Sequence, residues 1–236
     1  MTALASKLTY LKEATLDLLF PRRCVGCGRM GEFICLGCRR KLPRLAPPLC
    51  PKCGKPQSSG LLCANCWREP SKLDGIRSVC PFDGVMRQAI YELKYHNLKA
   101  ISDTLAELLA DYLKVNPLPG EVLIPVPLHP KRLKERGYNH SSLLSRELGK
   151  LIDLTVVDNC LVRLKHSLPQ ARAATVTERR RNVADAFFCR DERLKGKKVL
   201  LIDDVCTSGA TLEACAVALK DGGATSVWGL TLAREM

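Results

Sequence analysis

Residues 199–211 read VLLIDDVCTSGAT, and this stretch decides the fold. Residues 199–202 lack the polar alternation of a half-exposed strand, so they predict the central strand of a parallel sheet that is covered on both faces. Ligands of such sheets bind at the carboxyl ends of the strands. We expect Asp203 and Asp204 to lie there as acceptors for a vicinal diol, followed by an anion-binding loop of amides and hydroxyls ahead of a helix. A diol beside an anion describes a ribose 5-phosphate.

The same segment resembles the phosphoribosyl pyrophosphate signature of the type I phosphoribosyltransferases. That signature has four apolar residues, two acids and an apolar residue ahead of a Thr/Ser/Gly loop. The resemblance implies that Asp203 and Asp204 hold the ribose hydroxyls as the catalytic pair, and that Mg2+ arrives with the pyrophosphate. The loop expected to bind the 5-phosphate comprises Val205, Cys206, Thr207, Ser208, Gly209, Ala210 and Thr211. The alternatives are a plain strand and turn of another doubly wound domain or a Walker B strand, but no GxxxxGK[ST] loop accompanies the segment.

The cysteine pattern predicts two zinc sites near the N-terminus. Eight of the 13 cysteines form four CxxC pairs: Cys24 with Cys27, Cys35 with Cys38, Cys50 with Cys53, and Cys63 with Cys66. Two thiolates at this spacing can bind one tetrahedral Zn2+. We expect the first two pairs to share one structural zinc and the last two pairs to share the other. The exchanged pairing, and a redox or disulfide role for these cysteines, are open alternatives.

Of the other five cysteines, Cys206 is singled out by its place in the phosphate loop. Neighbouring loop amides would lower the pKa of its thiol. The remaining four, Cys80, Cys160, Cys189 and Cys215, are expected to be small buried apolar residues.

Composition indicates a basic globular protein with one ordinary domain and a small module. The chain has 236 residues, 46% of them hydrophobic, and a formal net charge of +13. No segment approaches the ~18 consecutive apolar residues that a membrane span needs. Basic clusters such as residues 131–136 and 179–181 would attract polyanions. Aromatic residues make up only 5% of the chain, so a stacking platform for nucleobases is weakly supported, and nucleic-acid contact stays open.

The rest of the chain alternates helix and strand, which favours a parallel α/β sheet. An amphipathic helix is expected over residues 1–20, a zinc module over 21–70, and a phosphoribosyltransferase-like domain over 71–236. Within the last, apolar periodicity predicts strands near residues 71–80, 122–126, 156, 161 and 227–232, and helices near 86–93, 101–112, 143–151 and 211–221.

Two further segments fit a pyrophosphate ligand. Residues 125–139 place a rigid proline turn and then a basic run after a predicted strand, and the expected pyrophosphate loop comprises Pro127, Leu128, His129, Lys131 and Arg132. His129 could donate a hydrogen bond there, although a structural role is the more common one for a single histidine. Residues 163–182 lack sustained periodicity and predict a flap over the site, with Gln170, Arg180 and Asn182 as candidate contacts.

Together, PVPLHPKRLKERGYNH (residues 125–140), the flap and the signature resemble the ComF/GntX family. In that family a double zinc ribbon precedes a phosphoribosyltransferase-like domain. The likeness runs from about Phe20 to the C-terminus, with departures at His140, where Gln is usual, and at Ser167, where Thr is commoner. It implies a cytoplasmic protein of natural competence and DNA utilisation that binds phosphoribosyl pyrophosphate. Incoming single-stranded DNA and proteins of the DNA-uptake machinery are the implied partners.

Two other functions are compatible with the sequence. One is an active phosphoribosyltransferase with no DNA role. Its base or amine acceptor is unidentified, because the sequence does not reveal the added hood with which type I enzymes select a nucleobase. The other is a zinc-ribbon regulator that senses the metabolite. We leave open whether the site is catalytically active.

Overall fold

The computed structural model describes residues 22–164, 186–190 and 192–236. It divides into two compact units between Leu42 and Pro43, and each is considered by itself. The domain boundaries expected from the sequence therefore stay predictions, and the helix expected over residues 1–20 lies outside the described residues. Among the residues that are described, no helix has both the length and the apolar character needed to cross a bilayer.

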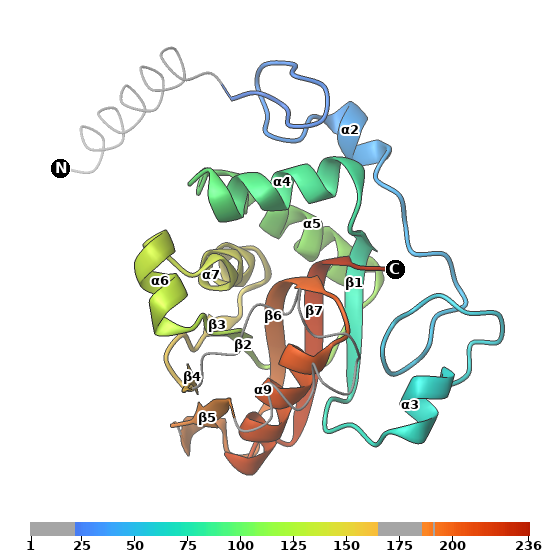
Figure 1. The fold of residues 1–236 in the computed structure, drawn as a ribbon, viewed down its shortest axis with the longest axis vertical. Helices are drawn as coiled ribbons and strands as arrows, with labels where there is room; N and C mark the ends of the chain where they lie inside the picture. Colours follow the sequence, from blue (N-terminus) through green and yellow to red (C-terminus); the bar gives the residue numbers. More distant parts are fainter. Residues whose placement is uncertain (1–21, 165–185, 191) are drawn as a thin grey trace. The chain divides into compact units, whose positions relative to one another are not determined.

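The larger unit is built on a five-stranded parallel sheet, which confirms the predicted fold class (Figure 1). In spatial order its strands are β1 (Gly75–Pro81), β7 (Ser226–Arg234), β6 (Lys198–Cys206), β2 (Val122–Pro125) and β3 (Thr155–Val156). β6 is the central strand and pairs in parallel with both β2 and β7. A separate antiparallel pair is formed by β4 (Leu161–Arg163) and β5 (Phe187–Cys189).

Helices cover both faces of the sheet. The described helices are α2 (Leu36–Arg40), α3 (Ala64–Arg68), α4 (Gly84–Tyr95), α5 (Ile101–Val115), α6 (Pro130–Arg136), α7 (His140–Ile152) and α9 (Ala210–Asp221), with a short 3-10 turn η2 (Glu192–Leu194). Figure 1 shows α9 in front of the central strands and α5 behind them. Val199 and Leu201 of β6 belong to the buried cluster that includes Leu212 and Leu219 of α9. Leu200 and Ile202 alternate to the opposite face and are also buried, which explains the uninterrupted apolar run.

Local sequence signals explain where the helices begin. Asp83 caps α4 by accepting a hydrogen bond from the Gly84 amide at 2.7 Å. Asn139 caps α7 in the same way through the amide of Ser141, at 3.1 Å. Both are short polar residues of the kind preferred at this position, because they satisfy an amide that has no partner within the helix.

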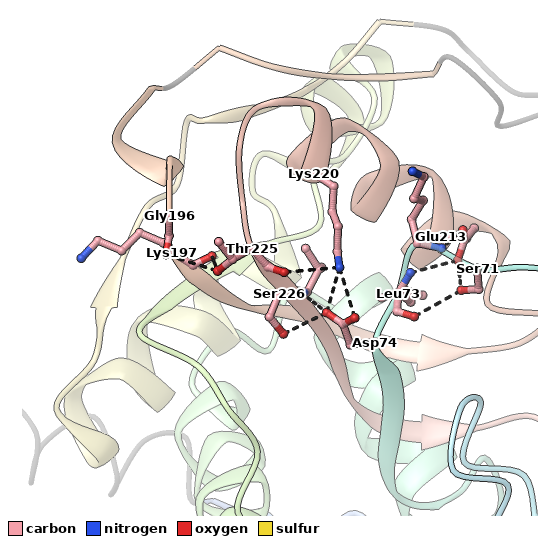
Figure 2. Close-up of polar contacts among 11 residues, drawn as sticks. Ser71, Leu73, Asp74, Gly196, Lys197, Glu213, Lys220, Thr225 and Ser226 are labelled. Carbon is pink, nitrogen blue, oxygen red and sulfur yellow. Dashed lines mark hydrogen bonds and ion pairs between the residues drawn. The ribbon is translucent and has the colours of Figure 1, made fainter.

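The amino end of β1 is fixed by a polar cluster (Figure 2). Asp74 accepts hydrogen bonds from the Val227 amide at 2.7 Å and from Ser226 Oγ at 2.9 Å, and both of its carboxylate oxygens lie 3.1 Å from Lys220 Nζ. Glu213 of α9 accepts hydrogen bonds from Ser71 Oγ and from the amide of residue 72. Burial would raise the pKa of Asp74, but these hydrogen bonds, the Val227 amide foremost, lower it. The cluster ties the segment that leads into β1 to α9 and β7.

The local structure differs from the sequence analysis in two places. The basic run at residues 130–136 forms the helix α6, which was not predicted. Pro130 stands at its first turn, where proline is favoured, and Gly137 ends it with φ +75°. In addition, β6 continues through Cys206, which pairs with Arg234. Asp203 and Asp204 therefore lie near the carboxyl end of the strand, where they were expected, but Val205 and Cys206, which were expected in the loop, belong to the strand.

Candidate functional site

A cavity of about 330 Å³ lies at the carboxyl ends of β2 and β6. Asp203, Asp204, Val205, Thr207 and Thr211 all line it, so the acid pair and part of the predicted phosphate loop face one space. Basic side chains from four other elements also line the cavity: Lys94 of α4, Arg132 and Arg136 of α6, His140 of α7 and Arg163 of β4. The cavity therefore combines two carboxylates with a strongly basic wall.

Asp204 is almost completely buried and lies against the side chains of Lys94 and His140. Its Oδ2 lies 2.5 Å from Lys94 Nζ and 3.5 Å from His140 Nε2. Burial by itself would raise the pKa of Asp204, but the charges of Lys94 and His140 lower it well below its ordinary range. Asp204 is therefore ionised under all ordinary conditions.

Asp203 has a different environment. It accepts hydrogen bonds from Ser141 Oγ and from the Asp204 amide, both at 3.0 Å, and lies 4.0 Å from His140 Nε2. Burial, together with the charge of Asp204, raises its pKa to about 6. The two neighbouring acids thus have opposite pKa shifts, a pattern that often marks functional sites.

The loop from β6 to α9, the predicted phosphate loop, leads into the helix through a glycine with positive φ. Gly209 stands immediately before α9 with φ +81°, which a residue with a side chain rarely adopts. Thr207 and Thr211 face the cavity, whereas the side chains of Cys206 and Ala210 are buried. Only the backbone of those two residues can therefore contact a ligand.

The expectation that loop amides lower the pKa of Cys206 was wrong. Cys206 is buried, and burial raises the pKa of its thiol to about 11. Its sulfur accepts a hydrogen bond from the guanidinium of Arg234 at 3.3 Å. Cys206 is therefore a packing residue beneath the loop.

The predicted pyrophosphate loop is divided by the structure. Pro127, Leu128 and Arg132 line the cavity. His129 caps α6, with its Nδ1 accepting a hydrogen bond from the Lys131 amide at 3.2 Å, and neither His129 nor Lys131 is among the lining residues. The predicted flap contacts Gln170, Arg180 and Asn182 lie outside the described residues.

Sequence reasoning missed the site residues that come from α4 and α7. Lys94 looks like an ordinary solvated charge on an amphipathic helix, and no local pattern marks it as the partner of Asp204. Ser141 was missed for the same reason. His140 was marked in the sequence, because Gln is usual at this position in the ComF/GntX family.

Two four-cysteine clusters fit zinc-ribbon sites, one in each unit. Within each cluster the four sulfurs lie within 4.8 Å of one another, and the members are Cys24, Cys27, Cys35 and Cys38, and then Cys50, Cys53, Cys63 and Cys66. This is the sequential grouping expected from the sequence. The Sγ atoms of Cys27 and Cys35 are 3.6 Å apart, and those of Cys53 and Cys63 are 3.7 Å apart. Tetrahedral zinc with bonds of about 2.3 Å has sulfur–sulfur edges of about 3.8 Å, so the donor sets match the ion.

The second cluster packs against the sheet within the larger unit. The carbonyl of Lys52 accepts a hydrogen bond from the Ile76 amide at 2.7 Å, and the carbonyl of Pro51 accepts one from Arg77 at 3.0 Å. Buried Arg234 at the end of β7 donates to the Cys53 carbonyl. This arginine therefore bridges the second cluster and Cys206 beneath the predicted phosphate loop.

Comparisons with known proteins agree with both parts of the structure. Residues 15–81 match the model of the double zinc ribbon domain, and residues 135–235 match that of the phosphoribosyl transferase domain. Competence protein ComFC of Bacillus subtilis is 31% identical over 86% of this chain and 85% of its own length. Competence protein F of Haemophilus influenzae is 32% identical over 91% of this chain and 98% of its own. DNA utilization protein YhgH of Escherichia coli O157:H7 is 30% identical over 83% of this chain and 88% of its own.

Proposed function

Because this chain belongs to the ComF family of competence and DNA-utilisation proteins, we propose that it binds phosphoribosyl pyrophosphate with Mg2+ and handles incoming single-stranded DNA in the cytoplasm. The domain that would bind the sugar phosphate is phosphoribosyltransferase-like. Proteins of the DNA-uptake machinery are proposed partners on the same basis.

One observation carries the ligand assignment. Asp203, Thr207 and Thr211 line a single cavity whose other walls carry Arg132 and Arg163. Carboxylate oxygens accept hydrogen bonds from sugar hydroxyls, the loop at the start of α9 suits a phosphate, and guanidinium groups suit a pyrophosphate. The arrangement thus offers one partner for each chemical group of the ligand.

The residues present suit Mg2+ as a partner of the pyrophosphate. The donor atoms of His140, Asp203 and Asp204 lie within 4.8 Å of one another, but the ammonium of Lys94 already lies beside Asp204. A metal bound directly to Asp204 would meet this positive charge, so Asp203 is the better residue to face the metal–pyrophosphate group. When bound, Mg2+ would neutralise charge on the pyrophosphate.

The binding proposal is tested by isothermal titration of phosphoribosyl pyrophosphate in the presence and absence of Mg2+. Asp203→Asn removes the anionic acceptor and should weaken binding about tenfold, since a hydrogen bond to a charged group contributes about 1.5–3 kcal/mol. Asp111→Asn is the matched control, because Asp111 is an exposed acid on α5 paired with Lys114. Equal affinities for wild type and Asp203→Asn would contradict this assignment.

The DNA proposal has a separate test. Fluorescence anisotropy with a labelled oligonucleotide should show binding to single strands that weakens as salt rises, because cationic side chains release counterions from the phosphates. Binding to a duplex of the same length should be weaker. If single strands do not bind at low salt, the DNA role is wrong even if the sugar phosphate binds.

An active transferase is the second candidate, and the raised pKa of Asp203 favours it. A cavity-facing carboxylate with a pKa near 6 is suited to accept a proton from a base or amine acceptor. The test is pyrophosphate release with Mg2+ across a panel of bases and amines. Release that requires both an acceptor and Asp203 supports the enzyme, and ligand binding without release with any acceptor favours the binding protein.

A further inference from the structure

Helix α4 presents an aromatic and basic stripe to solvent. Arg87, Tyr91 and Tyr95 follow one another at intervals of four residues, so they lie along one face of the helix. The opposite face is buried through Met86, Ile90 and other apolar residues. Tyr91 is 38% exposed and Tyr95 is 61% exposed. The core therefore does not account for these two rings, which both line the cavity at the carboxyl ends of β2 and β6.

The rings of this stripe form a continuous series of planar groups. Phe82 and Tyr91 are stacked with centroids 6.4 Å apart, and the Tyr91 and Tyr95 centroids are 5.3 Å apart. The Arg87 guanidinium lies 5.6 Å from the Tyr91 ring centroid, and that of Arg136 lies 5.1 Å from the Tyr95 centroid. Aromatic rings and guanidinium planes are the two kinds of side-chain surface on which unpaired bases stack.

A second cavity of about 790 Å³ continues from this stripe between α4 and α6. We call it the α4–α6 groove, and its lining residues are Lys94, Tyr95, Asn97, Lys99, Arg132, Glu135, Arg136, Gly137 and Tyr138. Four of these carry a positive charge and one, Glu135, a negative charge. The groove shares four lining residues with the cavity of about 330 Å³ described above, which we call the sugar-phosphate cavity: Lys94, Tyr95, Arg132 and Arg136. Tyr91 lines the sugar-phosphate cavity and not the groove. It therefore adjoins that cavity along a basic wall.

We propose that the α4–α6 groove and the Tyr91–Tyr95 stripe bind single-stranded DNA, with bases stacked on the two tyrosines and phosphates along Lys99, Arg132 and Arg136. The inference rests on the proposed DNA function and adds the place and the mode of binding. A positive groove with aromatic platforms is the general solution for single strands. A duplex keeps its base faces stacked on one another, so it cannot use the tyrosines.

The stacking contact is tested by a double substitution, Tyr91→Leu with Tyr95→Leu, which keeps apolar bulk and removes the rings. Affinity for a labelled oligothymidine should fall about tenfold or more, since stacking contributes about 1–3 kcal/mol per base. Tyr91→Phe with Tyr95→Phe should bind like wild type. Phe188→Leu is the matched aromatic control, because Phe188 is 53% exposed on β5. Equal losses in the Phe188→Leu and double-leucine variants would overturn the assignment to α4.

The electrostatic contact is tested at Lys99, which lines the groove and not the sugar-phosphate cavity. Lys99→Glu should weaken oligothymidine binding and reduce the slope of log K against log salt, by about 0.7 for each cation that is lost. Its affinity for phosphoribosyl pyrophosphate should match that of wild type. Lys114→Glu is the control, because this exposed lysine lies on α5 and outside both cavities.

Photocrosslinking locates the bases directly. An oligonucleotide with 5-iodouracil should crosslink to peptides that contain Tyr91 or Tyr95, and crosslinks confined to other peptides would overturn the proposal. Wild-type protein that binds no oligothymidine would refute both the DNA role and this site. If the wild type binds oligothymidine and the double-leucine and Lys99→Glu variants bind it with the same affinity, the groove assignment is refuted and the proposed function stays in place.

Discussion

At the scale of single residues, Asp203 should make ligand binding depend on pH. Its pKa is about 6 in the folded protein, so it is mainly neutral at pH 5 and mainly ionised at pH 7. The ionised form is the better acceptor, and Lys94, His140 and Arg163 face it with compensating charge. Affinity for phosphoribosyl pyrophosphate should therefore rise about tenfold from pH 5 to pH 7, as measured by isothermal titration.

The phosphate groups of the ligand also titrate near pH 6, so Asp203→Asn is the necessary comparison. The affinity of Asp203→Asn should keep only the pH dependence that comes from the ligand, so it should rise less steeply with pH than that of the wild type. Parallel curves for the two proteins would show that Asp203 does not titrate in contact with the ligand.

At the scale of elements, two glycines in equivalent knuckles should differ in their tolerance to substitution. Gly28 and Gly54 both have positive φ, at +75° and +71°, so alanine at either costs roughly 1–2 kcal/mol in backbone strain. A Cβ at Gly54 would also lie 2.5 Å from the Ile76 carbonyl oxygen, whereas nothing lies within 4 Å of one at Gly28. Gly54→Ala should lower the free energy of unfolding by at least about 2 kcal/mol more than Gly28→Ala.

This difference is measured by chemical unfolding followed by circular dichroism, with zinc content determined for both variants. Equal losses of stability would mean that the second knuckle can move away from β1 without cost.

The polar cluster at the start of β1 gives a second prediction at this scale. Asp74→Ala removes the acceptor of the Val227 amide and the partner of Lys220, and should cost about 1–3 kcal/mol. Because the folded-state pKa of Asp74 is lowered, its contribution is present above the unfolded pKa of about 3.9 and is lost as pH falls through the folded value. The difference in stability between wild type and variant should therefore shrink as pH falls below about 3.9, as checked by thermal unfolding at a series of acid pH values and at pH 7.

At the scale of the whole molecule, the two zinc sites should have different structural roles. The first cluster lies in the smaller unit, while the second packs on β1 and β7 of the larger one. Cys24→Ser with Cys38→Ser should remove one zinc and leave the sheet domain's unfolding temperature unchanged. Cys50→Ser with Cys66→Ser should also remove one zinc and lower that temperature, because metal binding supplies folding free energy.

Zinc content by mass spectrometry and unfolding by calorimetry check this prediction. A wild-type chain with fewer than two zinc ions, or the same unfolding temperature for both double variants, would be inconsistent with it.

The sequence by itself determined the features that depend on local chemistry. Three such features are the apolar run at residues 199–202, the acid pair that follows it and the CxxC spacing. Each depends on only a few neighbouring residues, so the parallel sheet and the two four-cysteine groups were predicted correctly. Helix α6 was missed although its signals were local, because the proline turn and the charges of residues 130–136 gave no apolar periodicity.

Only the tertiary structure decided which side chains share the site. Lys94 lies 110 residues from Asp204 in sequence, and its role arises because α4 and β6 converge at one edge of the sheet. The same convergence places Tyr95 beside Arg136, so a chain poor in aromatic residues still forms a stacking surface. Contacts between distant segments depend on how helices pack on the sheet, and no local pattern encodes that packing.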